Sequence, residues 1–100
     1  EENGVLTGVK IRDLQSGSAE VIPADGLFVS IGRSPATALF QGQLELDAGG
    51  YILAGESTAT SIPGVFAVGD VRTKQVRQII TAASDGAVAA HMAEEFLLEH

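Results

Sequence analysis

The sequence predicts an α/β fold, and three observations lead to this prediction. Apolar and polar residues alternate through the first third of the chain, which is typical of paired strands with one covered face. Two short apolar runs, at residues 26–32 and 65–68, lie between glycines, as expected for strands buried on both faces of a parallel sheet. An alanine-rich run at residues 76–97 has the length and composition of a helix.

Composition limits the size of the core and the kinds of partner. The chain has 100 residues, 45% of them apolar, so we expect one modest core. Thirteen acidic and six basic residues give a net charge of −7, which argues against nucleic acid or an anionic membrane as a partner. No cysteine is present, which excludes disulfides and thiol chemistry carried by this chain. Neither a membrane span nor a signal peptide is recognisable, and we expect a cytoplasmic protein.

The first third predicts a β-hairpin followed by a buried strand. GVLTGVKIRD (residues 4–13) and AEVIPA (residues 19–24) form the hairpin, joined by the turn-rich QSGS. GLFVSIG (residues 26–32) is the continuous apolar run, and we expect it to be a central strand. A Ser-Pro turn signal then predicts a hinge near Ser34 and Pro35.

The remaining elements follow in order. A short helical turn is expected within residues 37–47, a short strand in GGYILA (residues 49–54) and a polar loop in GESTATS. A Pro-Gly turn then leads into the buried strand Val65–Val68. For the helix, which we expect at Val76–Leu97, the sequence predicts an apolar face made of Ile79, Ile80, Ala83, Ala87, Ala90 and Phe96. Gly86 interrupts this helix at a cost of about 1 kcal/mol, which favours a closely packed backbone or a ligand beside it.

Asp70 lies where the second apolar run gives way to the helical segment, directly after Gly69. A carboxylate there can accept hydrogen bonds from the hydroxyls of a sugar or polyol, at the edge of the sheet where open α/β folds bind ligands. It would repel a phosphate at a helix N-terminus. Spacing alone leaves the alternative that Asp70 is only a cap or turn residue.

Two stretches carry a family resemblance. TSIPGVFAVGDVRTKQVRQIITAASDGAVAAHMAEEFL (residues 60–97) resembles the C-terminal segment of bacterial thioredoxin reductases and their low-molecular-weight flavoprotein relatives, and ADGLFVSIGRSPATALFQGQLELDAGGYI (residues 24–52) resembles the segment before it. The likeness extends over residues 3–97. Its most specific part combines Gly69-Asp70, Arg77-Gln78 and the TAA triplet at residues 81–83.

The resemblance implies a flavin site. Asp70, next to Gly69, would bind the ribityl chain of FAD, and the helix start at Arg77, Gln78 and Ile79 would lie against the pyrimidine side of the isoalloxazine. A helix N-terminus carries about half a positive charge, which would stabilise a reduced flavin. Two alternatives stay open: Arg77 as a solvated surface cation and Gln78 as a cap of its own helix.

The resemblance also implies two domains joined by a hinge. Residues 1–33 would be the end of an NADPH-binding domain, with its closing hairpin and last strand, and residues 34–97 the C-terminal part of an FAD-binding domain. Arg33 would lie at the hinge, on the NADPH side, where it could pair with a phosphate or an interdomain carboxylate. The last residues, 98–100, resemble a cloning scar that runs into a histidine tag, although a native C-terminus can also read Leu-Glu-His.

Departures from the family pattern indicate a fragment of a flavoprotein with two dinucleotide-binding domains. Ser84 stands where glycine is common, and Asp85 follows it, which puts close packing of this helix turn in doubt. Neither G-x-G-x-x-G nor C-x-x-C occurs, so we expect the fragment alone to be inactive. Its uncovered apolar faces favour self-association, including exchange of strands or helices.

The expected parent is an NADPH-dependent disulfide reductase that is homodimeric and passes electrons to thioredoxin or a related dithiol protein. One alternative keeps FAD and NADPH but changes the acceptor, as in the flavoprotein component of alkyl hydroperoxide reductase or a thioredoxin-reductase-like ferredoxin reductase. A second alternative is an interaction or assembly module with no redox role. No metal site and no catalytic residue is expected in this segment.

Overall fold

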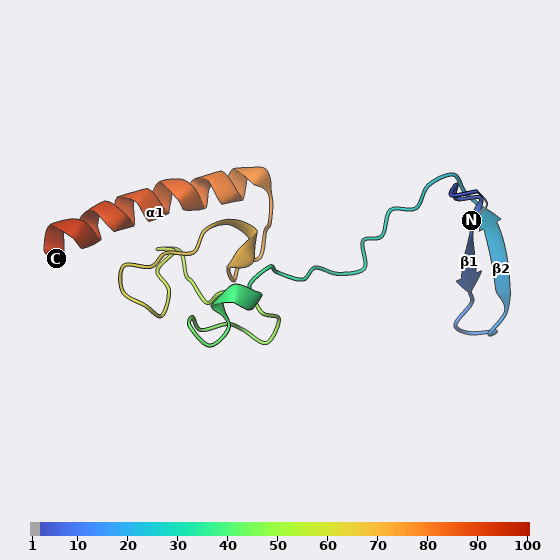
Figure 1. Cartoon of the computed structure of the whole chain (residues 1–100), viewed down its shortest axis with the longest axis horizontal. Coiled ribbons are helices and arrows are strands. Elements are labelled where there is room, and N and C mark those ends of the chain that lie inside the picture. Colours follow the sequence, from blue (N-terminus) through green and yellow to red (C-terminus); the bar gives the residue numbers. More distant parts are fainter. Residues whose placement is uncertain (1–2) are drawn as a thin grey trace. The chain divides into compact units, whose positions relative to one another are not determined.

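The computed structural model describes residues 3–100, and it divides into two units that meet between Gly32 and Arg33 (Figure 1). The prediction for residues 1–33 therefore has its first two residues outside the described part. In chain order the elements are β1 (Gly8–Arg12), β2 (Ala19–Pro23), the 3-10 helices η1 (Ala38–Phe40) and η2 (Gly69–Val71), and α1 (Ile79–Glu99). The α/β fold class is confirmed, since strands and a long helix coexist in the one chain.

The first unit is built on the predicted hairpin. β1 and β2 pair antiparallel, with Gly8 opposite Pro23 and Arg12 opposite Ala19. Asp13 closes the connection by accepting the backbone N–H groups of Gln15 and Ser16 at 2.7 and 3.0 Å. An aspartate that binds the backbone two and three residues ahead is a common way to start a turn, and it accounts for the tight loop between the strands.

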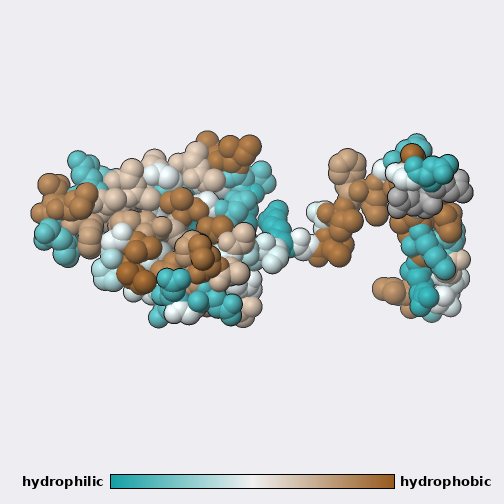
Figure 2. Space-filling view, in the orientation of Figure 1, coloured by the Kyte–Doolittle hydropathy of each residue, from teal (hydrophilic) through white to brown (hydrophobic). Residues whose placement is uncertain are grey.

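The run at residues 26–32 differs from the prediction. It is extended but has no ladder partner in the part of the chain that the structure describes, and Phe28 and Ile31 are 99% and 96% exposed. Figure 2 shows apolar groups uncovered along this segment. A strand of a parallel sheet needs neighbours that are distant in sequence. The apolar pattern is present in this segment, and no such neighbours lie among residues 3–100.

A small core holds the second unit together. Ile52, Ala54 and Ala67 are buried, and Leu44, Leu46 and Val71 pack against them. Ile52 donates its N–H to Val71 O at 2.8 Å and accepts from Thr73 N at 2.9 Å, so residues 52 and 71–73 pair like parallel strands. The short strand predicted in residues 49–54 is thus reduced to bridges at Ile52, and the predicted helical turn is η1.

The second buried strand and the helix also need correction. Val65 and Val68 are 38% and 41% exposed, and only the bridge between Ala59 and Phe66 orders this run. The predicted apolar face of α1 is wrong except at Phe96. The side chains turned towards the unit are Thr81, Ala82, Asp85, Val88, Ala89, Met92, Ala93 and Phe96. The prediction relied on apolar residues alone. It therefore passed over the inward position Asp85, which is charged, and chose the neighbouring alanines instead.

Candidate functional site

A sharp turn brings the Asp70 region onto α1. Gly69 has φ +77°, a left-handed conformation that side chains of L-residues rarely adopt, and it begins η2. A Cβ placed on Gly69 would lie 3.7 Å from the Ala82 Cβ, so this backbone runs against the first turns of the helix. Asp70 follows with an exposed side chain, and it is therefore free to meet a ligand.

Asp70 and the start of α1 line the same pocket. Its walls are Asp70, Arg77, Gln78, Ile79 and Ala82, and its volume is about 310 Å³. Four of the predicted site residues thus meet in one place, and Gly69 precedes them directly. Arg33 lies in a neighbouring pocket of about 340 Å³, which Tyr51, Asp70 and Arg77 also line.

The N-terminus of α1 presents positive potential to this pocket. Gln78 occupies the N-cap position, in an extended conformation, and its backbone N–H donates to the Thr81 hydroxyl at 3.0 Å. The Gln78 side chain in turn accepts from the Thr81 backbone N–H, so Gln78 caps its own helix. The Ile79 and Ile80 N–H groups are left without a carbonyl partner within the helix. No acidic residue stands in the first turn, so the helix dipole is not compensated there by its own sequence.

Arg77 is held by its neighbours. Its guanidinium donates to the carbonyl oxygens of Asp70 at 3.1 Å and Arg72 at 3.2 Å, and its Cζ lies 3.9 Å from the centroid of the Tyr51 ring. A guanidinium over a tyrosine face is a favourable cation–π arrangement. The alternative that Arg77 is a freely solvated cation is therefore wrong, and part of its function is to hold the Asp70 turn.

A buried ion cluster lies beneath the turn, and the sequence analysis missed it. The Asp85 carboxylate accepts from Arg72 Nε at 2.8 Å, Arg72 Nη2 at 2.7 Å, Lys74 Nζ at 2.7 Å and the Gly69 N–H at 2.9 Å. The hydrogen bonds from Arg72 hold the pKa of the Asp85 carboxyl well below its usual range. Asp85 in turn raises the pKa of Arg72. The signals in the sequence were an acid, Asp85, within the apolar helical run and two cations, Arg72 and Lys74, shortly after Asp70.

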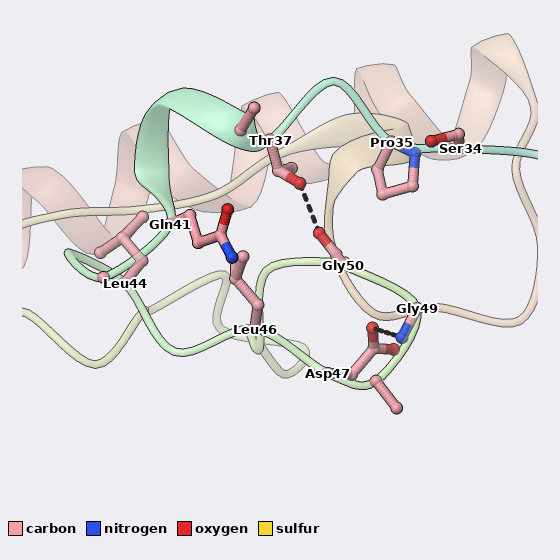
Figure 3. A pocket seen from close by; sticks show the side chains of 12 residues that line it. Ser34, Pro35, Thr37, Gln41, Leu44, Leu46, Asp47, Gly49 and Gly50 are labelled. Carbon is pink, nitrogen blue, oxygen red and sulfur yellow. Dashed lines mark hydrogen bonds between the residues drawn. The ribbon is translucent and has the colours of Figure 1, made fainter.

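A larger pocket lies elsewhere in the second unit. It measures about 520 Å³ and lies between the segment after Pro35 and the loop that ends at Gly50 (Figure 3). Thr37 is buried and donates to Gly50 O at 2.5 Å, and Asp47 accepts from the N–H groups of Gly49 and Tyr51, each at 2.8 Å. These polar groups form hydrogen bonds with backbone groups of the loop, so they stabilise the loop and do not indicate a catalytic role.

Three further findings concern the described residues. Open space surrounds the position where a Gly86 side chain would be, so of the two predicted reasons for this glycine, a packed backbone or a ligand, close packing is not found. Among residues 3–100, no group of acidic or histidine side chains is arranged to hold a metal ion. The described helices include none with the length and apolar character to cross a membrane.

The comparisons with known proteins agree with one another. The family model for pyridine nucleotide-disulphide oxidoreductases matches residues 1–86. Thioredoxin reductase from Escherichia coli O157:H7 is 52% identical over 98 residues, covering 92% of this chain and 30% of that protein. Thioredoxin reductase from Neurospora crassa is 48% identical over 101 residues, covering 100% of this chain and 30% of that protein.

Solved structures give the same result for the fold. The crystal structure of Lactococcus lactis thioredoxin reductase in its FR conformation matches with a TM-score of 0.83 and 36% identity, over 94% of this chain and 31% of that one. Thioredoxin reductase from T. acidophilum matches with a TM-score of 0.82 and 36% identity, over 92% of this chain and 31% of that one. The chain thus spans about 30% of the length of the relatives it matches.

Proposed function

Because the chain belongs to the pyridine nucleotide-disulphide oxidoreductase family, we propose that it is the C-terminal part of an NADPH-dependent, FAD-containing thioredoxin-disulfide reductase. Residues 1–33 would end the NADPH-binding domain and residues 34–97 would complete the FAD-binding domain. The relatives described above are named thioredoxin reductases, which favours thioredoxin as the acceptor over a hydroperoxide reductase partner or ferredoxin.

One observation carries the proposal for the site: the exposed Asp70 carboxylate and the first residues of α1 share a pocket. FAD needs two unlike surroundings at this end of the molecule. Ribityl hydroxyls are donors and suit a carboxylate, whereas the N1 and O2 side of the flavin gains negative charge on reduction and suits backbone N–H groups. The pocket offers both kinds of group next to each other.

Each predicted residue has a role that fits this assignment. Asp70 would accept hydrogen bonds from the ribityl chain, and Gly69 would let the backbone come close to it. Gln78 and Ile79 would present the helix N-terminus to the pyrimidine ring. Arg77 would hold the turn through its bonds to the carbonyl oxygens of Asp70 and Arg72. Arg33 lines the adjacent pocket and would serve the hinge on the NADPH side.

The bound flavin would supply hydride chemistry, taking a hydride from NADPH. The residues of this chain would bind and orient the cofactor and stabilise its reduced form electrostatically. A dithiol must come from outside these residues, because the chain contains no cysteine. We therefore propose that this segment alone is inactive. We also propose that the intact reductase is a cytoplasmic homodimer acting on thioredoxin or a related dithiol protein.

The experiment is the substitution Asp70→Ala in the intact reductase, with FAD content measured after purification. The expected result is loss of most of the bound FAD, since a hydrogen bond to a charged group in a sheltered site is worth about 1.5–3 kcal/mol. Glu94→Ala is the matched control, because Glu94 is an exposed acid on α1 outside the pocket. Unchanged FAD retention in the Asp70 variant would remove the assignment.

A further inference from the structure

We propose that Asp85 is a positioning residue for the Asp70 turn, acting through a buried cluster with Arg72 and Lys74. This inference rests on the proposed function, because it concerns the same flavin site. Asp85 lies one helical turn beyond Ala82 on the inward face of α1, directly under the Gly69 backbone. It joins the loop that carries Asp70 to the helix whose N-terminus completes the pocket.

Both oxygens of the Asp85 carboxylate accept hydrogen bonds. Oδ2 accepts from the Gly69 N–H, Arg72 Nε and Lys74 Nζ, and Oδ1 accepts from Arg72 Nη2. Three donors therefore share Oδ2 and one binds Oδ1, so both oxygens of the carboxylate are engaged. Gly69 precedes Asp70 in the sequence, and Arg72 and Lys74 follow it. The turn is thereby fixed at both its entry and its exit.

The three charged side chains of the cluster are buried. The side chains of Asp85, Lys74 and Arg72 are 8%, 7% and 11% exposed. Removing the carboxylate would leave two cations with little access to water, which is unfavourable unless the loop moves outward. The Arg72 Nη1 also donates to the carbonyl oxygens of Ala54 and Thr73, at 3.2 and 2.9 Å, so Arg72 links the turn to the core segment.

The cluster connects to the pocket through Arg77. The carbonyl oxygen of Arg72 accepts from Arg77, and Arg77 donates in turn to the carbonyl oxygen of Asp70. Asp85, Arg72, Arg77 and the 69–70 backbone therefore form one continuous set of hydrogen bonds around the turn. Loss of Asp85 frees the Gly69 N–H and Arg72 together, and the Asp70 carboxylate loses its place relative to the start of α1.

The test compares variants of the intact reductase by the dissociation constant of FAD in reconstitution and by the visible flavin spectrum. Asp85→Asn keeps the size of the side chain and removes its charge. Glu95→Gln, also on α1, is the matched control, because its side chain is 52% exposed and its carboxylate pairs with the exposed His91. A third variant, Arg72→Met/Lys74→Met/Asp85→Leu, replaces the whole cluster by apolar groups, an exchange that buried ion clusters often tolerate without loss of stability.

The expected result for Asp85→Asn and for the triple variant is a rise of about tenfold or more in the FAD dissociation constant, with a shifted flavin spectrum and a melting temperature of the triple variant near wild type. Unchanged affinity and spectrum in a folded variant would overturn the proposal. Failure of both variants to fold would also reject it, because the cluster would then serve folding alone. Asp70→Asn, run in parallel, separates the two claims: if it also leaves FAD binding unchanged, the flavin site itself is misplaced.

Discussion

Gly69 is the residue whose backbone conformation directs the Asp70 carboxylate towards the start of α1. Its φ of +77° lies in the left-handed region, where a Cβ costs about 1–2 kcal/mol. The nearest side-chain atom to an added Cβ is 3.7 Å away, an ordinary contact, so crowding adds little to this cost. Glycine is therefore required at position 69 for its backbone conformation, directly before Asp70, the proposed ligand contact.

Gly69→Ala is expected to lower the free energy of unfolding of the chain by about 1–2 kcal/mol, because alanine strains the left-handed conformation. Denaturant unfolding followed by helical circular dichroism measures this. Gly86→Ala is the matched control, because Gly86 lies in α1 with open space around it and an alanine should stabilise the helix by up to about 1 kcal/mol. Equal effects of the two substitutions, in sign and size, would contradict this account of Gly69.

At the scale of elements, the Asp85 cluster fastens η2 and the following loop to α1. The helix contributes one carboxylate, and the loop contributes two cations and one backbone N–H. Asp85 is bonded to Arg72 across 13 residues of sequence. This contact explains why Ser84-Asp85, which departs from the resembling family, does not disturb the helix: the acid has its own partners in the same chain.

The cluster predicts a pH dependence of stability. The hydrogen bonds from Arg72 and Lys74 hold the pKa of Asp85 in the folded chain well below its usual range. The stabilising contribution of Asp85 is therefore complete above the usual pKa of an aspartate, about 3.9, and is lost as the pH falls further. Asp85→Asn lacks this contribution and is expected to cost about 3–5 kcal/mol near pH 7. The difference in unfolding free energy between wild type and variant should be constant above about pH 5 and shrink below about pH 4. A difference that stays constant down to about pH 2 would contradict the assigned ion pairs.

The elements show what sequence reasoning can and cannot reach. The hairpin and α1 were predictable because their signals are local: alternation on either side of a turn, and a long alanine-rich run. The runs at residues 26–32 and 65–68 were predicted as buried strands because their apolar pattern matches that of a central strand, but a strand forms only against partners, which residues 3–100 do not supply.

The candidate site also has one part that the sequence predicts and one part that it does not. The meeting of Asp70 with Gln78 and Ile79 was predictable, since only eight or nine positions separate Asp70 from the helix start. Asp85 was not placed, because its partners are set by which helix face turns inward. That face was predicted from apolar residues alone. Such a prediction assigns an acidic residue to the exposed face, even where two cations allow the acid to be buried.

At the scale of the whole molecule, the described chain leaves much apolar surface uncovered. Phe28 and Ile31 are almost fully exposed in the extended segment after β2, and Ile79 and Ile80 are 90% and 76% exposed at the start of α1. Exposed apolar groups of this size are typical of surfaces that bind another polypeptide. The relatives are about three times as long as this chain, which covers about 30% of them, and we expect further polypeptide of the intact reductase to cover these faces.

The chain on its own is therefore expected to self-associate at micromolar concentration, by exchange or addition of strands and helices. Sedimentation velocity measures this directly. Phe28→Ser/Ile31→Ser should shift the distribution towards monomer, whereas Leu14→Ser, which changes an equally exposed residue in the β1–β2 connection, should not. A compact monomer of the unmodified chain across this concentration range would contradict the prediction.

The most direct measurement is a crystal structure of the intact reductase with FAD bound, in which the distance from the Asp70 carboxylate to the flavin is measured. The account predicts a carboxylate oxygen of Asp70 about 2.5–2.7 Å from a ribityl hydroxyl oxygen, with the first backbone N–H groups of α1 directed at the pyrimidine edge of the flavin. An Asp70 carboxylate more than about 4 Å from every flavin oxygen would contradict it, since no hydrogen bond spans that distance.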